Sequence, residues 1–188
     1  MKYYILFGPP GAGKGTQAKK IITKFNYLHL STGDLLRGEI KKGSKLGKNA
    51  AFIIEQGNLV PDEIVADMIK KQFEAHKNDV DGFLLDGFPR TKKQAVMLDK
   101  ILFEMNQEVT QILSLHLDDK YIFDRIFHRA QIEGRKDDTK TEVIQNRIDT
   151  YHSKTEPLIS YYKKQDKYFE IDGLGTIDEI FEKISKIF

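Results

Sequence analysis

The chain of 188 residues contains no cysteine, which excludes disulfide bonds and thiol chemistry and fits a reducing compartment. Its net charge is only +2, because 30 basic residues nearly balance 28 acidic ones. A chain without a strong overall field is not drawn to nucleic acid or membranes, so any basic character that matters must be local. Long apolar runs are also missing, since the N-terminal one ends at Phe7. We therefore expect a cytoplasmic protein that binds neither nucleic acid nor membranes.

A glycine-rich turn near the N-terminus is the most informative stretch. The letters GPPGAGKGT (8–16) follow an apolar run, 3–7, and precede a helical pattern, 17–25. Strand, glycine loop and helix in this order are typical of a phosphate-binding P-loop. Backbone N–H groups and the positive end of the helix dipole then converge on an anion, and Lys14 adds a mobile charge. A glycine-rich hairpin is the alternative, and the flanking strand and helix patterns argue against it.

One position departs from the usual P-loop pattern. Gly15, rather than serine or threonine, follows Lys14, and the hydroxyl comes one residue later at Thr16. The sequence therefore does not by itself predict a hydroxyl that ligates a metal directly.

Short β-prone segments alternate with helical patterns along the whole chain. The predicted strands are 3–7, 27–30, 83–85, 112–117 and 168–171. Such alternation predicts an α/β fold with a parallel sheet of five strands, and the length suits one compact core. We find no repeat, low-complexity tract or flexible linker. The stretch 31–61 is rich in glycine and short helices and is expected to form a small flap.

Three capping boxes are predicted to start helices. The pairs are Ser31 with Asp34, Thr139 with Glu142, and Thr176 with Glu179. The polar, aperiodic stretch 131–138 predicts a loop. His29 and His116 fall inside strands and are expected to be core residues rather than catalysts.

Arginines gather in segments expected near the carboxyl ends of the strands or on the flap. They are Arg37, Arg90, Arg125, Arg129, Arg135 and Arg147. Arginine binds phosphate oxygens in pairs, and phosphoryl transfer needs alignment and positive charge more than covalent help. The alternative is that these arginines form ordinary surface ion pairs, such as Arg125 with Asp124 or Arg135 with Asp137.

Asp86 follows an apolar run, 83–85, which is typical of a strand buried on both faces. A carboxylate at that strand tip lies where ligands bind in open α/β sheets. We expect Asp86 to hold Mg²⁺ through water, because this ion keeps much of its hydration shell.

Several motifs together carry a resemblance that covers the whole chain. They are GPPGAGKGTQ (8–17), STGDLLR (31–37), GNLVP (57–61), GFLLDGFPRT (82–91), RKDD (135–138) and YHSKTEP (151–157). In these segments the chain resembles the adenylate kinase family, in its short-lid form. The resemblance implies a P-loop NTPase-type three-layer sandwich and the reaction MgATP + AMP ⇌ 2 ADP, in adenine nucleotide homeostasis.

The resemblance also divides the chain. It implies a core (1–30, 61–124 and 139–188), a flap that binds the monophosphate (31–60) and a short lid (125–138). A monomer with Mg²⁺ as cofactor is implied. No structural zinc is expected, because the lid lacks the insertion that carries cysteine ligands in some members.

The resemblance also implies roles for the residues that match the family's motifs. Similarity to the family implies an ATP site made of Gly11, Ala12, Gly13, Lys14, Gly15, Thr16, Arg125, Arg129 and Gly175. It implies an AMP site made of Thr32, Arg37, Asn58, Leu59, Val60, Gly87, Phe88, Pro89, Arg90, Gln94, Arg135 and Arg147. The implied catalytic groups are Lys14, Arg90, Arg129, Arg135 and Arg147.

Within these sites, the resemblance gives some side chains a particular task. Gln94 is implied to hydrogen-bond the adenine edge of AMP, and Arg125 to stack on the adenine of ATP. Asp137 and Asp138 are implied to orient arginines rather than to act as a base.

Three rival functions are each compatible with part of the sequence. UMP/CMP kinases share the fold but tend to carry alanine where this chain has Thr32 and asparagine where it has Gln94. A protein that binds ATP without transferring phosphate would need only one nucleotide site, and it leaves the second arginine set on the flap unexplained. A nucleic-acid binder is disfavoured by the balanced charge.

Overall fold

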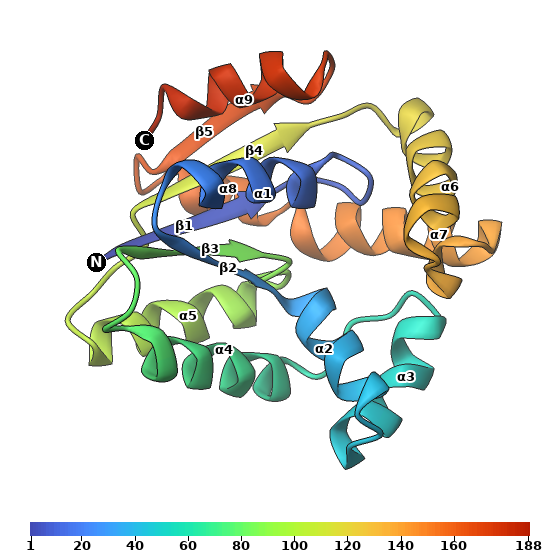
Figure 1. Ribbon diagram of the computed structural model, residues 1–188, viewed down its shortest axis with the longest axis horizontal. Coiled ribbons are helices and arrows are strands. Elements are labelled where there is room, and N and C mark those ends of the chain that lie inside the picture. The colour runs from blue at the N-terminus through green and yellow to red at the C-terminus, as the bar shows by residue number, and fades with distance from the viewer.

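The structure is a computed structural model that describes residues 1–188, the side chain of Lys136 excepted. Its centre is one parallel sheet with the strand order β2-β3-β1-β4-β5 (Figure 1). The strands are β1 (Lys2–Phe7), β2 (Tyr27–Ser31), β3 (Gly82–Asp86), β4 (Gln111–His116) and β5 (Tyr168–Asp172). All five predicted strands are present, so the predicted α/β fold with a parallel sheet is confirmed.

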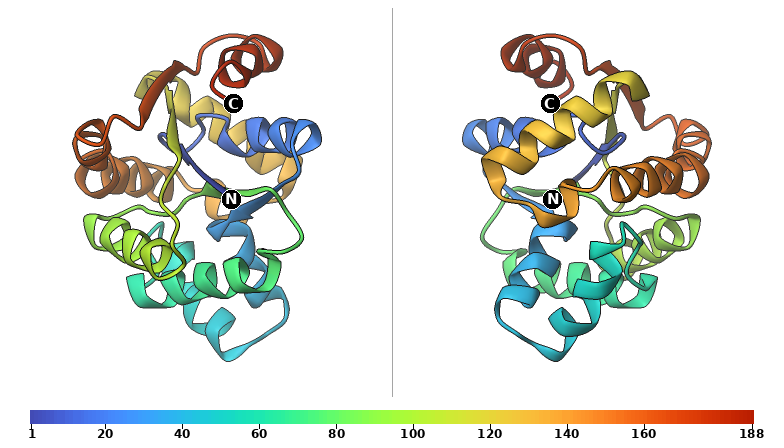
Figure 2. Two further views of the ribbon diagram at one scale, coloured as in Figure 1. Left: turned by 90° about the vertical axis from the view of Figure 1, so that its left-hand side faces the viewer. Right: turned by 90° about the vertical axis from the view of Figure 1, so that its right-hand side faces the viewer.

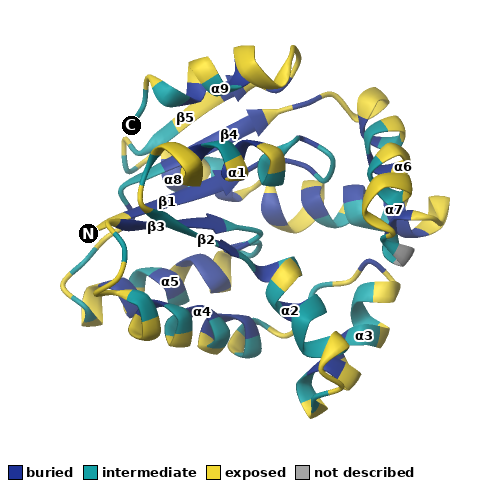
Figure 3. Ribbon diagram, in the orientation of Figure 1, coloured by how far each residue is buried: buried dark blue, intermediate teal, exposed yellow. Residues whose placement is uncertain are grey.

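Successive side chains of β1 point to opposite faces of the sheet and so enter two different cores. Tyr3 and Ile5 belong to one cluster of buried residues, while Tyr4 and Leu6 belong to the other. Because both faces are covered, residues 3–7 of β1 are all buried and apolar rather than alternating, and only Lys2 at its start is exposed. The buried strands form the middle layer in Figure 3.

Helices cover both faces of the sheet and make the predicted three layers (Figures 1 and 2). The first core is closed by α4 (Asp62–His76), α5 (Lys92–Glu104) and α8 (Leu158–Lys163). The second core is closed by α1 (Lys14–Lys24) and α9 (Ile177–Ser185), together with the inner faces of α6 (Ile122–Glu133) and α7 (Thr141–Thr150). Three short turns complete the chain: η1 (Asp119–Tyr121), η2 (Lys136–Asp138) and the π-helical η3 (Tyr151–Thr155).

Two excursions extend beyond the carboxyl ends of the strands (Figure 1). The first is the helical pair α2 (Thr32–Lys41) and α3 (Lys45–Glu55), which follows β2. These helices pack so closely that a Cβ at Gly47 would lie 2.1 Å from the carbonyl oxygen of Glu39. The second excursion is α6, η2 and α7. The expected flap (31–60) contains α2 and α3, and the expected lid (125–138) covers most of α6 together with η2, whereas α7 falls in the expected core. This division of the chain stays a prediction.

The first predicted capping box forms only in part. The Ser31 hydroxyl accepts the backbone N–H of Asp34 at 3.3 Å and caps α2. The Asp34 carboxylate, however, accepts a hydrogen bond from Arg37 at 2.6 Å instead of reaching back to the cap. A charge-assisted bond to a side chain one turn further along is the stronger competitor for that carboxylate.

The second predicted capping box is wrong. α7 begins at Thr141 with Lys140 as its N-cap and without a side-chain cap. The box assigned to Thr139 and Glu142 fails because the chain first forms the short turn η2. The third box, Thr176 with Glu179, is confirmed in both directions, at 3.2 and 2.8 Å.

Two further expectations need correction. His116 is not a core residue: it ends β4, and 64% of its side chain is exposed because it lies beyond the buried part of the sheet. His29 is mostly buried, as expected. The stretch 131–138 is not simply a loop, because α6 continues to Glu133 and η2 follows. Within the described residues, none of the helices combines the length and hydrophobicity that crossing a membrane requires.

Candidate active site

The glycine loop lies between the end of β1 and the start of α1, as predicted. Gly11 and Gly13 adopt φ values of +79° and +93°, which L side chains rarely adopt. Gly8 packs so tightly that a Cβ there would lie 2.4 Å from the carbonyl oxygen of Leu115. α1 begins at Lys14, earlier than predicted, so Lys14, Gly15 and Thr16 form its first turn and their N–H groups point out of the helix.

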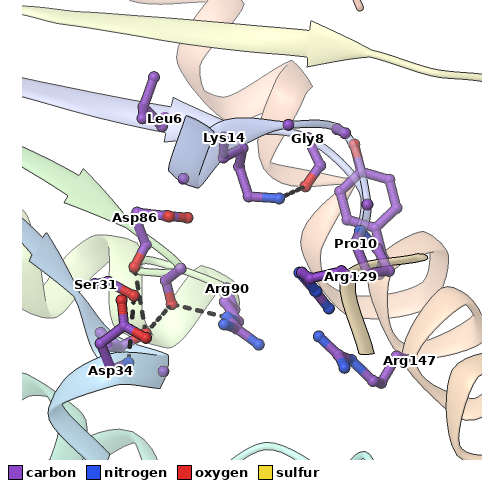
Figure 4. A pocket seen from close by; sticks show the side chains of 18 of the residues that line it. Leu6, Gly8, Pro10, Lys14, Ser31, Asp34, Asp86, Arg90, Arg129 and Arg147 are labelled. Carbon is purple, nitrogen blue, oxygen red and sulfur yellow. Dashed lines mark hydrogen bonds between the residues drawn. The ribbon is translucent and has the colours of Figure 1, made fainter. Parts of the chain in front are cut away.

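Lys14 folds back over this loop (Figure 4). Its Nζ donates hydrogen bonds to the carbonyl oxygens of Gly8 and Pro9, both at 2.8 Å. Burial lowers the pKa of Lys14 to about 8; the charge of Asp86 opposes this shift, and that of Arg90 adds to it. The ammonium is therefore held in a poorly solvated site, where an anionic ligand would stabilise its charge.

Asp86 ends β3 beside the P-loop, and only 14% of its side chain is exposed. Its Oδ2 lies 3.4 Å from Nε2 of His29. Burial by itself would raise the pKa of Asp86, but the close contact with His29 and the charge of Lys14 lower it below the ordinary value. A single ionised carboxylate therefore faces the glycine loop.

Three arginines from three different elements converge in front of Lys14 (Figure 4). Arg90 follows β3, and its Nε donates to the carbonyl oxygen of Gly87 at 2.8 Å. Burial lowers the pKa of Arg90 to about 10, and the nearby charge of Arg147 adds to this effect, so Arg90 stays charged at neutral pH. Arg129 lies on α6 and Arg147 on α7.

Asp138 holds the last two arginines together. Its side chain is completely buried; Oδ2 accepts Nε of Arg129 at 2.7 Å, and Oδ1 accepts the second guanidinium nitrogen at 2.9 Å. Oδ1 also contacts Nη1 of Arg147, which in turn lies 3.2 Å from Asp137. This arrangement agrees with the orienting role expected for both carboxylates.

The flap contributes the opposite wall of the site. Thr32 donates to the carbonyl oxygen of Gly87 at 2.9 Å. Arg37 and Arg135 share the carboxylate of Asp34, at 2.6 and 3.8 Å. Arg135 also pairs with Glu133, at 2.5 Å, rather than with Asp137 as the alternative interpretation proposed.

Two predicted adenine-site residues lie at opposite ends of the site. Arg125 on α6 donates to the carbonyl oxygen of Gly173 at 3.1 Å, close to the loop that carries Gly175. Gln94 in the first turn of α5 is buried, and its amide is hydrogen-bonded to neighbouring protein groups. Arg125 therefore pairs with backbone and not with Asp124.

These elements enclose one cavity of about 870 Å³ at the carboxyl ends of the strands. Every predicted site residue lines it except Phe88, including the flap residues Asn58, Leu59 and Val60. Phe88 is 1% exposed and belongs to the first hydrophobic core, so its side chain anchors the loop instead of facing a ligand. The assignment of Phe88 to the AMP site stays a prediction, which its buried side chain does not support.

Sequence reasoning missed residues that act through the backbone of the site. Thr155 in η3 donates to the carbonyl oxygen of Arg90 at 2.9 Å. Asn146 on α7 donates to the carbonyl oxygen of Gln56 at 2.7 Å and to Oδ1 of Asn58 at 3.1 Å. Thr155 lies within the YHSKTEP segment, which was a usable signal, whereas Asn146 carried none.

A parallel sheet whose first strand runs into a glycine loop, facing arginines across a large cavity, defines a P-loop nucleotide-binding protein of the phosphoryl-transfer type. A family model described as adenylate kinase matches residues 6–167. The chain is also 47% identical over 180 residues to the adenylate kinase of Phocaeicola vulgatus, covering 96% of this chain and 94% of the relative. The chain belongs to the adenylate kinase family and is an enzyme, a phosphotransferase.

Two other relatives match this chain over a similar length. The adenylate kinase of Bacteroides thetaiotaomicron is 46% identical over 180 residues, covering 96% of this chain and 94% of the relative. That of a Synechococcus species, strain CC9902, is 44% identical over 188 residues, covering 100% and 99%.

Proposed function

We propose that this enzyme transfers the terminal phosphoryl group of MgATP reversibly to AMP, giving two molecules of ADP. The observation that supports it is a single cavity with two separate sets of anion-binding groups. One set is the P-loop with Lys14; the other is Arg37 and Arg90, on the flap and after β3. A protein that only held ATP would need the first set alone.

In this proposal the first turn of α1 binds the ATP phosphates through its N–H groups. Lys14 exchanges its bonds to the carbonyl oxygens of Gly8 and Pro9 for the transferring group. Arg129, Arg135 and Arg147 line the same cavity, and in this proposal they balance the charge of the transferring group. Gly175 and Arg125 line the adenine end of the ATP site.

AMP is proposed to bind between the flap and the β3–α5 loop. Arg37 and Arg90 would hold its phosphate, and Gln94 its adenine. An oxygen of that phosphate attacks the terminal phosphorus of ATP, the new P–O bond forms, and the bond to the ADP oxygen breaks. No general base is required, because the attacking oxygen is already an anion. The equilibrium lies near unity, since one phosphoanhydride bond is exchanged for another.

Mg²⁺ is proposed as the cofactor that arrives with ATP. Asp86 fits it: one buried, ionised carboxylate faces the glycine loop, and Mg²⁺ is commonly held by one or two carboxylates together with water and phosphate. In the part of the chain that the structure describes, no three His, Asp or Glu side chains cluster as they would around a protein-only metal site. When bound, the ion would neutralise charge on the phosphates; Asp86 would hold its water shell.

The remaining parts of the proposal concern the enzyme as a whole. We propose that it works as a monomer in the cytoplasm, in adenine nucleotide homeostasis, without nucleic acid as a partner. A structural zinc is not expected, because zinc sites of the structural kind rely on cysteine and the chain has none.

The test is a comparison of phosphate acceptors with ATP as donor. We expect kcat/KM for AMP to exceed the values for CMP, UMP and GMP by orders of magnitude. A comparable value for CMP would replace this proposal with a pyrimidine monophosphate kinase of the same fold. Separate titrations of ATP and AMP serve as the control: binding at one site only, without ADP formation, would indicate a nucleotide-binding protein rather than a kinase.

A further inference from the structure

Gln94 is held by two neighbours of opposite hydrogen-bonding character. Its Oε1 accepts the backbone N–H of Arg90 at 2.7 Å, and its Nε2 donates to Oδ1 of Asp62 at 2.8 Å. Asp62 is the first residue of α4 and also accepts the Thr91 hydroxyl at 3.3 Å. The buried Gln94 amide therefore links the first turns of α4 and α5.

These two neighbours determine which way the amide points. A backbone N–H can only donate, and an ionised carboxylate can only accept. Turning the Gln94 amide over would direct its oxygen at the carboxylate of Asp62 and its NH₂ at the N–H of Arg90. Both contacts would then be repulsive, and the buried amide and its two partly buried neighbours would each lose a partner, so only the observed orientation satisfies all three residues.

The pinned amide still has hydrogen-bonding capacity for a ligand. An amide carries two N–H donors and two oxygen lone pairs, and the two hydrogen bonds described use one of each. Gln94 lines the cavity, so the remaining donor and acceptor are available there in a fixed order. A base must present its own groups in the complementary order to pair with both.

Purines differ in that order. Adenine presents the N6 amino donor beside the N1 acceptor, whereas a 6-oxopurine presents the O6 acceptor beside an N1–H donor. The Gln94 amide in one orientation pairs with the edge of adenine, and in the reversed orientation it pairs with the edge of a 6-oxopurine. An amide free to turn over could serve both edges, while a pinned one serves a single edge.

We propose that Asp62 is a specificity-determining positioning residue, which sets the enzyme's preference for adenine over 6-oxopurine monophosphates by preventing Gln94 from turning over. This inference rests on the proposed function, in which Gln94 binds the base of AMP. Asp62 touches no substrate in it and acts only through Gln94.

The test compares AMP with IMP, which differs from AMP in the atoms at positions 1 and 6 of the base. Asp62→Asn keeps the shape of the side chain but offers both a donor and an acceptor, so it removes one of the two contacts that fix the Gln94 amide. Only the backbone N–H of Arg90 then still opposes turning the amide over. We therefore expect the ratio of kcat/KM for AMP to that for IMP to fall, by less than the full discrimination that one bidentate amide–base pair provides. KM for ATP should stay unchanged.

Two matched variants separate positioning from general damage. Glu63→Gln removes the same charge at the next position of α4, where the side chain pairs with Lys93 instead of Gln94, and should leave the ratio unchanged. Adding Asp62→Asn to Gln94→Ala should not change the ratio further, because the positioned amide is gone. If Asp62→Asn folds poorly, the ratio of kcat/KM for AMP to that for IMP is measured for Asp62→Ala instead. Because each result is a ratio from one preparation, reduced stability alone cannot imitate it.

The proposal is overturned if Asp62→Asn lowers kcat/KM for AMP and IMP by the same factor, or if it changes the ratio equally with and without Gln94. A wild-type enzyme that does not phosphorylate AMP would refute the proposed function instead. The two failures are therefore distinguishable in one set of assays.

Discussion

Lys14 shows how a single buried charge can be prepared for a ligand. Its ammonium is largely shielded from water and is compensated by two neutral carbonyl oxygens, at 2.8 Å each, and by Asp86 further away. Burial of a cation without a full counter-charge favours its neutral form, which explains why the pKa of Lys14 falls to about 8. A triphosphate supplies the missing negative charge.

This leads to a prediction about proton uptake. Because the pKa of Lys14 is about 8 without ligand, the side chain is largely neutral at pH 9, and ATP binding should raise its pKa and draw in about one proton. At pH 7 the lysine is already protonated, so uptake should be close to zero. Calorimetry of MgATP binding in buffers of different ionisation enthalpy measures this directly.

The control for this experiment is Lys14→Met, which should bind MgATP more weakly and without proton uptake at pH 9. Equal uptake by the variant and the wild type would assign the proton to another group and contradict the role given to Lys14.

At the scale of secondary-structure elements, α6 and α7 depend on one carboxylate. Asp138 in η2 has no exposed surface and bonds to Arg129 on α6 and Arg147 on α7. Burial alone would raise the pKa of Asp138, but the hydrogen bond from Arg129 and the charges of Arg147 and Arg129 lower it below the ordinary value. The ionised carboxylate is thus stabilised by the fold.

We predict that Asp138→Asn lowers the free energy of unfolding at pH 7 by about 3 kcal/mol, because two arginines lose a buried partner. The lowered pKa of Asp138 means that its contribution is fully present above the ordinary value of 3.8 and is lost as the pH falls through the lower folded-state value. Urea unfolding of variant and wild type should therefore show a gap that narrows as the pH drops below about 4.

The matched control is Glu142→Gln, which removes the same charge from an exposed position on α7. Its unfolding free energy should stay within about 0.5 kcal/mol of the wild type. A gap for Asp138→Asn that does not change with pH would show that the stabilisation does not come from the ionised carboxylate.

The π-helical turn η3 is another element with an identifiable task. Turns of this kind are rare and often lie at functional sites. Here the turn follows α7, and its Thr155 hydroxyl donates to the carbonyl oxygen of Arg90 in the loop after β3. The helix α7 therefore carries Arg147, and the turn η3 directly after it supports the backbone of Arg90.

At the scale of the whole molecule, the two excursions already touch each other. Asn146 on α7 bonds to the backbone of Gln56 and to Asn58. A Cβ at Gly57 would lie 2.9 Å from the carbonyl oxygen of Val143. These contacts are few and partly exposed, which is typical of a region that opens at low cost. Both excursions border the cavity, where water must be kept away from the transferring phosphoryl group.

We predict that binding of a bisubstrate analogue, two adenosines joined through a phosphate chain, closes the flap against the lid. The absence of cysteine allows two to be introduced for labelling, at the exposed positions Lys48 on α3 and Gln131 on α6. The distance between the labels should shorten when the analogue binds. In Asn146→Ala the ligand-free distance should lengthen, while the analogue-bound distance should not. An identical distance with and without the analogue would falsify closure.

Much of the fold could be predicted from the sequence because its signals are local. Apolar runs such as those of β1 and β3, and the helical patterns between them, required burial in a parallel sheet. The P-loop was recognisable because its glycines, Lys14 and the following helix are consecutive in the chain. The cap at Thr176 could be predicted for the same reason.

Only the tertiary structure decided which distant groups became neighbours. In it the Phe88 side chain packs into the core, His116 is exposed at the end of a strand, and the Asp34 carboxylate pairs with Arg37. It also paired Asp62 with Gln94 and enclosed Asp138 between two helices. A hydrogen bond or ion pair forms only between atoms that lie a few ångströms apart in space. Residues far apart in the chain reach such distances only when the sheet and its helices have assembled, so the sequence alone does not identify these pairs.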